Sequence, residues 1–137
     1  MSEKNSFKEL SEVSCRVEKK GRFSYVSWAE AWKQTKLLYP SATYKVYEKE
    51  DVKEGIIYST GKPLFSISEK GGAFVKVGVT INGVEHIEFY PITDHFNKAI
   101  ACERIDVMNI NTSIKRALVK ALAFHGLGIK VYENEEL

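Results

Sequence analysis

The sequence predicts an α+β fold, and three stretches of the chain support this class. Residues 73–81 and 84–90 are β-rich runs on either side of Asn82-Gly83, which is the pattern of an antiparallel β-hairpin. Residues 27–38 and 112–124 instead repeat apolar side chains at helical spacing. A hairpin combined with separate helices is typical of the α+β class.

The composition is that of an ordinary globular domain. The chain has 137 residues, of which 44% are hydrophobic and 28% are charged, and its formal net charge is +2. This length is enough to bury a core. We therefore expect one domain at residues 23–137, preceded by an arm or short helix at residues 1–22.

Signals for export, membranes and metals are weak in the sequence. No run approaches the about 20 apolar residues that span a bilayer, and residues 1–15 lack the apolar segment of a secretory signal. Cys15 and Cys102 form neither a disulfide framework nor a zinc-ligand spacing. We expect a cytoplasmic protein with no membrane partner, no metal and no cofactor.

The first firm helix should begin at Ser27. This serine is followed three residues later by Glu30, which is the spacing of a capping box. The helix should stop near residue 38, because Pro40 disfavours helical geometry in the residue before it. Trp28 and Trp32 follow helical spacing, so a place in the core is favoured for both over stacking on bases.

Strands should follow this helix. Residues 42–48 are expected to form a strand, the charged segment EKEDVKEG a loop, and residues 56–68 a strand interrupted at residues 61–63. In the later hairpin, a two-residue turn would place Ile81 beside Val84. One face of that hairpin would then carry Val75, Val77, Val79 and Ile81, and the other face Lys76, Gly78, Ile87 and Phe89.

The second firm helix is predicted at residues 112–124. Asn111 or Thr112 would cap it and Gly126 would end it, with a short strand after the glycines. Residues 91–108 lack clean periodicity, so a loop is expected there, with a short helical piece near residues 98–103.

One side of this second helix is basic. On a helical wheel Ser113, Arg116 and Lys120 lie opposite the apolar side, and Lys115 flanks that side. The apolar side contains Ile114, Ala117, Leu118, Ala121 and His125. Between residues 112 and 130 there are four basic residues and no acidic one. Such a local run suits the phosphates of a nucleic acid, although a solvated basic face explains it equally well.

Other candidate sites are weaker. His125 is expected to be a hydrogen-bonded core histidine, and neither His86 nor His95 has partners at metal-ligand spacing. Asp94, Asp106 and Glu103 would build a Mg²⁺ nuclease site only if the fold brought them together. The segment from Gly55 to Pro63 fails as a phosphate-binding loop, because five residues separate its glycines and proline replaces the Ser or Thr.

Three segments in order resemble one known family. They are SYVSWAEAWKQTKLLYPSATYKVYE (24–48), PITDHFNKAI (91–100) and INTSIKRALVKALAFHGLGIKVYENEEL (110–137). Together they are similar to the Sak-type single-strand annealing proteins of bacteriophages. The last segment is also similar to the DNA-binding core of the eukaryotic Rad-type annealing protein. This resemblance implies the annealing-protein core fold, in which an antiparallel, β-hairpin-rich sheet packs against a long basic helix.

The resemblance also implies a function without enzymatic chemistry. It suggests ATP-independent annealing of single-stranded DNA in phage homologous recombination, by subunits joined into rings or filaments in the bacterial host cell. Lys115 and Arg116 would carry most of the DNA contact. Weaker candidates are Lys120, Lys98, Arg104 and Lys76, and the aromatic residues Tyr25 and Phe96 would suit stacking on unpaired bases. A phage exonuclease or a single-strand-binding protein would be a further partner.

Three alternatives remain open from the sequence. The first is a monomeric RNA- or duplex-binding module that uses the same basic helix. The second is the metal-dependent nuclease with Asp94 and Asp106. The third is a protein–protein adaptor without affinity for nucleic acid.

Overall fold

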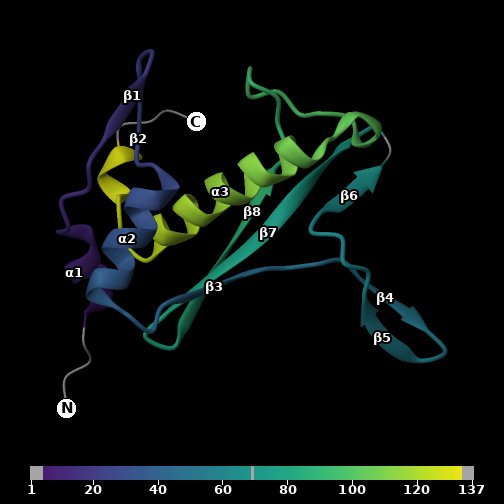
Figure 1. The fold of residues 1–137 in the computed structure, drawn as a ribbon, viewed down its shortest axis with the longest axis horizontal. Coiled ribbons are helices and arrows are strands. Elements are labelled where there is room, and N and C mark those ends of the chain that lie inside the picture. Colours follow the sequence, from purple (N-terminus) through teal and green to yellow (C-terminus); the bar gives the residue numbers. More distant parts are fainter. Residues whose placement is uncertain (1–4, 69, 134–137) are drawn as a thin grey trace. The chain divides into compact units, whose positions relative to one another are not determined.

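The structure is a computed structural model that describes residues 5–68 and 70–133. Its elements are α1 (Ser6–Ser11), β1 (Glu18–Lys20), β2 (Phe23–Tyr25), α2 (Trp28–Leu38), β3 (Thr43–Val46), β4 (Glu50–Lys53), β5 (Ile56–Ser59), β6 (Phe65–Ser68), β7 (Gly72–Ile81), β8 (Val84–Pro91), η1 (Cys102–Arg104), α3 (Val107–Phe124) and η2 (Ile129–Val131), as Figure 1 shows. The pairings of β1 with β2, of β4 with β5 and of β6 with β7 are antiparallel. The α+β class is therefore confirmed.

Three sheets contain the strands. β1 pairs with β2, and β4 pairs with β5, each as a separate two-stranded sheet. The third sheet has the order β3-β7-β6, and β8 also pairs with β7. The turn between β7 and β8 has positive φ at Asn82 (54°) and Gly83 (79°), as a type I′ turn requires. The hairpin predicted at Asn82-Gly83 is confirmed.

The chain folds into two compact units. The first unit takes in the chain up to Tyr44, Val79–His86 and the chain from Leu118 onward. The second unit takes in Lys45–Gly78 and Ile87–Ala117. The helix α3 thus contributes its first half to the second unit and its last turns to the first.

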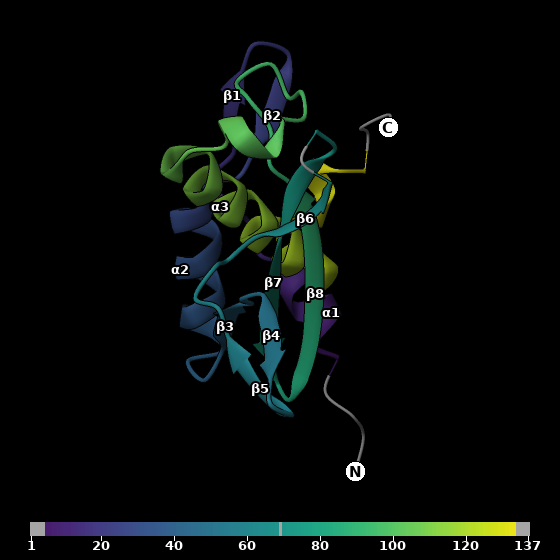
Figure 2. The same cartoon turned by 90° about the vertical axis from the view of Figure 1, so that its right-hand side faces the viewer.

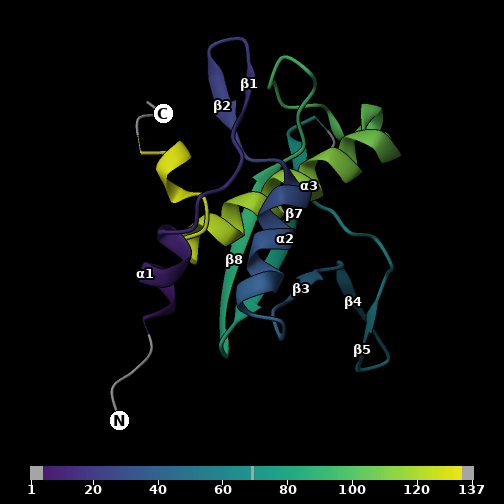
Figure 3. The same ribbon diagram turned by 60° about the vertical axis from the view of Figure 1, so that its left-hand side comes forward.

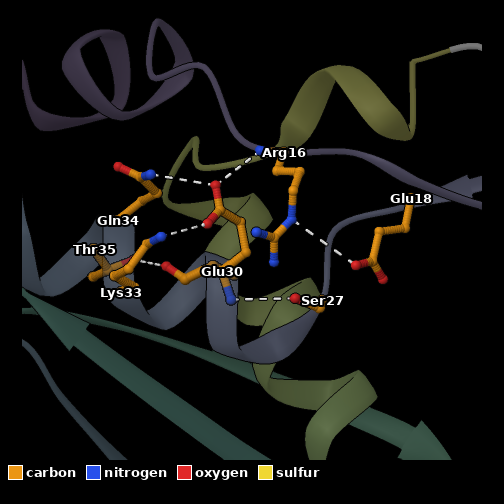
Figure 4. Close-up of polar contacts among 8 residues, drawn as sticks. Arg16, Glu18, Ser27, Glu30, Lys33, Gln34 and Thr35 are labelled. Atoms are coloured by element: carbon orange, nitrogen blue, oxygen red, sulfur yellow. Dashed lines mark hydrogen bonds and ion pairs between the residues drawn. The ribbon is translucent and has the colours of Figure 1, made fainter.

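The first unit is organised around α2 and the last turns of α3. Ser27 caps α2 by accepting a hydrogen bond from the Glu30 backbone N–H (3.2 Å), as the sequence predicted. The buried Glu30 carboxylate does not complete the box on Ser27. It accepts hydrogen bonds from the Arg16 backbone N–H (2.8 Å) and from Gln34, and it pairs with Lys33 (Figure 4). The hydrogen bond from Arg16 is the main cause that lowers the Glu30 pKa to about 2.

Gly126 lets α1 approach the end of α3 within this unit. Figure 1 and Figure 3 show α1 beside the turn that follows α3. Gly126 has a φ of 113°, and a Cβ there would lie 2.5 Å from the Phe7 carbonyl oxygen. Glycine is therefore required at this position both by backbone conformation and by space. The prediction that the helix ends at Gly126 is confirmed.

The second unit contains β4 and β5, most of β6 to β8, and the first half of α3. β4 and β5 form a hairpin (Figure 2), and β4 lies in the segment EKEDVKEG that was predicted to be a loop, so that prediction was wrong. The physical reason is its turn, because Glu54 (φ 53°) and Gly55 (φ 78°) adopt the same left-handed conformation as Asn82 and Gly83. The strand predicted at residues 56–68 is interrupted between Ser59 and Phe65, as expected.

Two predictions about α3 and the segment after it were wrong. α3 begins at Val107, five residues earlier than predicted, because Asp106 and Asn109 cap it. The Asp106 carboxylate accepts the Asn109 N–H (2.8 Å), and the Asn109 side chain accepts the Asp106 N–H (3.0 Å). The strand predicted after the glycines is instead the 3-10 helix η2, which Gly128 enters in the left-handed conformation.

Burial also differs from the helical wheel at two residues. Trp28 is 43% exposed, whereas Ala31 and Thr35 fill the buried side of α2, so Trp28 is not a core residue. Ser113 is 1% exposed and lies at i, i+4 spacing with the buried Ala117. The buried arc of α3 is therefore wider than predicted. It includes Ser113, whereas Arg116 lies outside it.

Candidate nucleic-acid interface

The first half of α3 carries two of the predicted DNA contacts in the second unit. The whole helix contains Lys115, Arg116 and Lys120 and no acidic residue. Lys115 and Arg116 are both partly buried. The groups that hold these cations decide whether they can bind phosphate, because a carboxylate partner would cancel their charge.

A tight loop from Thr93 to Ala99 lies next to Arg116 in this unit. Thr93 and Ala99 form an isolated antiparallel bridge, which closes the loop at its base. Inside it, Asp94 accepts hydrogen bonds from the backbone N–H groups of Phe96 (2.8 Å) and Lys98 (3.0 Å). These bonds lower the Asp94 pKa, with the Lys98 N–H as the largest cause, so the carboxylate stays ionised at neutral pH.

Arg116 is anchored to this loop by neutral groups. Its Nη1 donates to Thr93 Oγ1 (3.2 Å) and to Asn97 Oδ1 (3.2 Å). Within residues 5–68 and 70–133 no carboxylate pairs with this guanidinium. Asn97 reaches it from a left-handed backbone conformation (φ 61°) that asparagine tolerates. These two neutral acceptors orient the Arg116 guanidinium without cancelling its positive charge.

The same loop also carries exposed side chains. Lys98 is exposed, and Phe96 is 70% exposed. The His95 ring lies with its centroid 3.9 Å from that of Phe96. The sequence placed Lys98 and Arg116 in one binding set, and the structure brings the loop of Lys98 to Arg116.

Arg104 also belongs to the second unit and lies outside the loop from Thr93 to Ala99 in the chain. It is exposed and lines a pocket of about 670 Å³ together with Lys70, Asp94 and Glu103. Two cations and two carboxylates line this pocket, so its charge is balanced. The pocket therefore offers less attraction to a polyanion than Arg116 does.

Lys76 lies on β7 among aromatic rings. Its Nζ is 4.5 Å from the centroid of Tyr47 and 5.6 Å from that of Phe89. Lys76 and Phe89 therefore share a sheet face, as predicted, and Phe89 remains 55% exposed there. Such cation–π contacts keep the charge of the lysine while restricting its side chain.

Lys120 and the histidines His86 and His125 belong to the first unit. The Lys120 Nζ lies 5.8 Å from the centroid of Tyr132. His125 is 5% exposed, and its Nε2 lies 2.7 Å from the Val79 carbonyl oxygen, so the predicted core histidine is confirmed. Burial lowers the His125 pKa. His86 stacks edge-on against His125, with centroids 4.4 Å apart.

The carboxylates of the nuclease alternative have structural roles. Asp94 holds its loop and Asp106 caps α3. Over the described ranges, no three His, Cys, Asp or Glu side chains gather in a way that could hold a metal ion. No helix within those same ranges is both long enough and apolar enough to cross a membrane.

Sequence reasoning missed the residues that orient Arg116. Thr93 and Asn97 are 23 and 19 residues away from it in the chain, so no local pattern connects them. The one available signal was the asparagine in DHFNKAI, because Asn is enriched at left-handed loop positions. Lys70, at the pocket of Arg104, was missed as well.

Comparison with known proteins supports the resemblance read from the sequence. Searches among curated proteins and among solved structures gave no match. The family model described as Sak Single Strand Annealing Protein matches residues 5–137, which is nearly the whole chain. The chain therefore belongs to the Sak single strand annealing protein family.

Proposed function

We propose that this protein anneals complementary DNA strands without ATP, in phage homologous recombination inside a bacterial host cell. The proposal rests on membership of an annealing family and on one observation. Arg116 is held by the neutral side chains of Thr93 and Asn97, so its guanidinium is oriented and fully charged. That arrangement suits the phosphates of a strand, whose binding by Lys and Arg supplies most sequence-independent affinity.

Annealing requires contacts to the sugar–phosphate backbone and not to base edges. Backbone contacts position a strand without reading its sequence, so any strand can be accepted. The Watson–Crick edges stay available, and pairing with a complementary strand then needs no covalent step, cofactor or enzyme activity. Lys115 and Arg116 carry most of the contact in this proposal, and Lys98 extends it along the loop. Lys120, Arg104 and Lys76 are weaker candidates.

An annealing protein must also hold many nucleotides at once, and we propose that subunits join into a ring or filament for this purpose. The β4–β5 hairpin supports the idea, because it exposes apolar side chains. Val52 and Ile57 face each other across its strands and are 61% and 65% exposed. An isolated two-stranded hairpin is marginally stable in water, so cover by a second copy of the chain would stabilise it. A phage exonuclease or a single-strand-binding protein is the further partner that we propose.

Annealing of two labelled complementary oligonucleotides tests the proposal. The wild-type protein should accelerate annealing in the absence of ATP. Lys115→Ala combined with Arg116→Ala should slow it and should weaken binding to all strands alike. The slope of log K against log salt should flatten by about 1.4, the value for two lost contacts on a single strand.

A matched control removes two charges elsewhere. Lys19 and Lys20 are exposed on β1, and their double alanine variant should keep the wild-type salt slope. An unchanged slope in a folded Lys115→Ala, Arg116→Ala variant would remove α3 from the site. Equal or tighter binding to RNA or duplex DNA by a monomer would favour the alternative module.

A further inference from the structure

We propose that the loop from Thr93 to Ala99 is a base-stacking site, in which the ring of Phe96 packs against an unpaired base. This inference rests on the proposed function and adds to it a contact with the base itself. Backbone contacts explain affinity for any strand, whereas a stacking contact explains how a protein distinguishes unpaired from paired bases.

Phe96 is exposed on a hydrogen-bonded loop backbone. Its side chain is 70% exposed, although a phenylalanine gains most by burial. Hydrogen bonds within the loop hold the backbone that carries this side chain. Asp94 accepts the Phe96 and Lys98 N–H groups, and the Asp94 N–H donates to the Lys98 carbonyl oxygen (2.8 Å). A side chain on such a backbone binds with little further loss of conformational entropy.

A cation is bound to the residue next to Phe96 in the loop. Asn97, the neighbour of Phe96 in the chain, accepts a hydrogen bond from Arg116. A phosphate at the guanidinium therefore brings its own nucleotide close to the loop. Proteins that bind single strands without sequence preference combine these two features, a positive track and aromatic rings beside it.

The Phe96 ring has an aromatic neighbour, His95. His95 contacts Phe96 with ring planes inclined at 42°, and Phe96 still keeps most of its surface exposed. The neighbouring ring limits the conformations of Phe96 without covering it. Every base has a π-face, so stacking on such a ring is tolerant of sequence, as annealing requires.

Abasic DNA provides the test, because it keeps the sugar–phosphate chain and lacks the bases. Binding of an ordinary oligonucleotide and of an abasic strand of equal length is measured by fluorescence anisotropy. The wild type should bind the ordinary strand about five- to tenfold more tightly, the lower range for one stacked base. Phe96→Ala and Phe96→Leu should reduce this ratio toward one, and Phe96→Trp should restore it.

Phe124→Ala is the matched control, because Phe124 is 57% exposed and lies outside the loop. It should keep the wild-type ratio. A wild type without preference, a Phe96→Ala variant with an unchanged ratio, or an equal drop in the control would overturn the inference. A changed particle size in Phe96→Ala with an unchanged ratio would assign Phe96 to a subunit contact and overturn it too.

The proposed backbone contact at Arg116 and the proposed stacking site at Phe96 are contradicted by different results. Arg116→Ala should lower affinity for ordinary and abasic strands by the same factor, because both strands carry the phosphates. If that loss is seen while Phe96→Ala has no effect, the backbone site stands and only the stacking site is lost.

Discussion

At the scale of single residues, the charge of Arg116 depends on what holds it. Thr93 and Asn97 orient the guanidinium through neutral oxygens. Glu30 in the first unit is the opposite case, because Lys33 lies 3.1 Å from its carboxylate and that pair neutralises itself. Both side chains belong to hydrogen-bond networks, but only the network around Arg116 leaves a net charge for a ligand.

Asn97→Asp tests the importance of this neutral partner. The substitution keeps the size of the side chain and its tolerance of a left-handed backbone, but it places a carboxylate against Arg116. DNA binding should weaken, and the salt slope should flatten by about 0.7, the value for one lost phosphate contact. A salt titration of oligonucleotide binding measures both effects.

Asn97→Gly is the control for this change. Glycine accepts the φ of 61° and removes the amide without adding charge. It should weaken binding less than Asn97→Asp does. If the two variants bind equally, the neutrality of the partner has no role at this site.

At the scale of elements, the cap on α3 decides where the basic helix begins. Asp106 and Asn109 exchange backbone hydrogen bonds, and the helix extends from Val107 because of them. The sequence placed the cap at Asn111 or Thr112. Both residue types cap helices, and the preferences for Asp, Asn and Thr at this position differ too little to show which of them begins the helix.

Asp106→Ala should therefore destabilise the protein by about 1 kcal/mol, the typical loss for an N-cap side chain. Asp106→Ser should retain most of the stability, because the serine hydroxyl can accept the same N–H. Urea unfolding measures the difference. Nuclease activity in wild type that disappears in Asp106→Ala would instead support a catalytic carboxylate.

The hairpins show how far turn chemistry can be read from sequence. Asn82-Gly83 was predicted because both residues favour positive φ, and the turn has that geometry. Glu54-Gly55 has it as well, but a glutamate at φ 53° is not a local preference. The hairpin of β4 and β5 was missed for this reason.

At the scale of the whole molecule, the proposed ring or filament predicts that the exposed β4–β5 hairpin is a subunit contact. Val52→Thr with Ile57→Thr keeps the β-propensity of both strands and removes their exposed apolar surface. We expect the assembled protein to shift to smaller species, which light scattering coupled to size-exclusion chromatography would measure. Leu37→Gln, at a residue of α2 that is 72% exposed, should leave the assembly unchanged. Equal sizes for the wild type and the hairpin variant would exclude this hairpin from the subunit contact.

The sequence by itself determined the features that depend on neighbours within about four residues. These include the start of α2 at Ser27, the turn at Asn82-Gly83 and the absence of acidic residues along α3. Helix caps, tight turns and charge patterns are set by such short separations, so they can be read directly.

Only the tertiary structure decided which charged side chains form hydrogen bonds and which residues are their partners. Arg116 meets Thr93 and Asn97 across 23 and 19 residues of chain, and Ser113 is buried against expectation. Hydrogen bonds and burial of this kind arise between segments that are distant in sequence. Their partners are fixed when the chain packs, and for that reason the periodicity of α3 predicted its cations but not the loop that orients them.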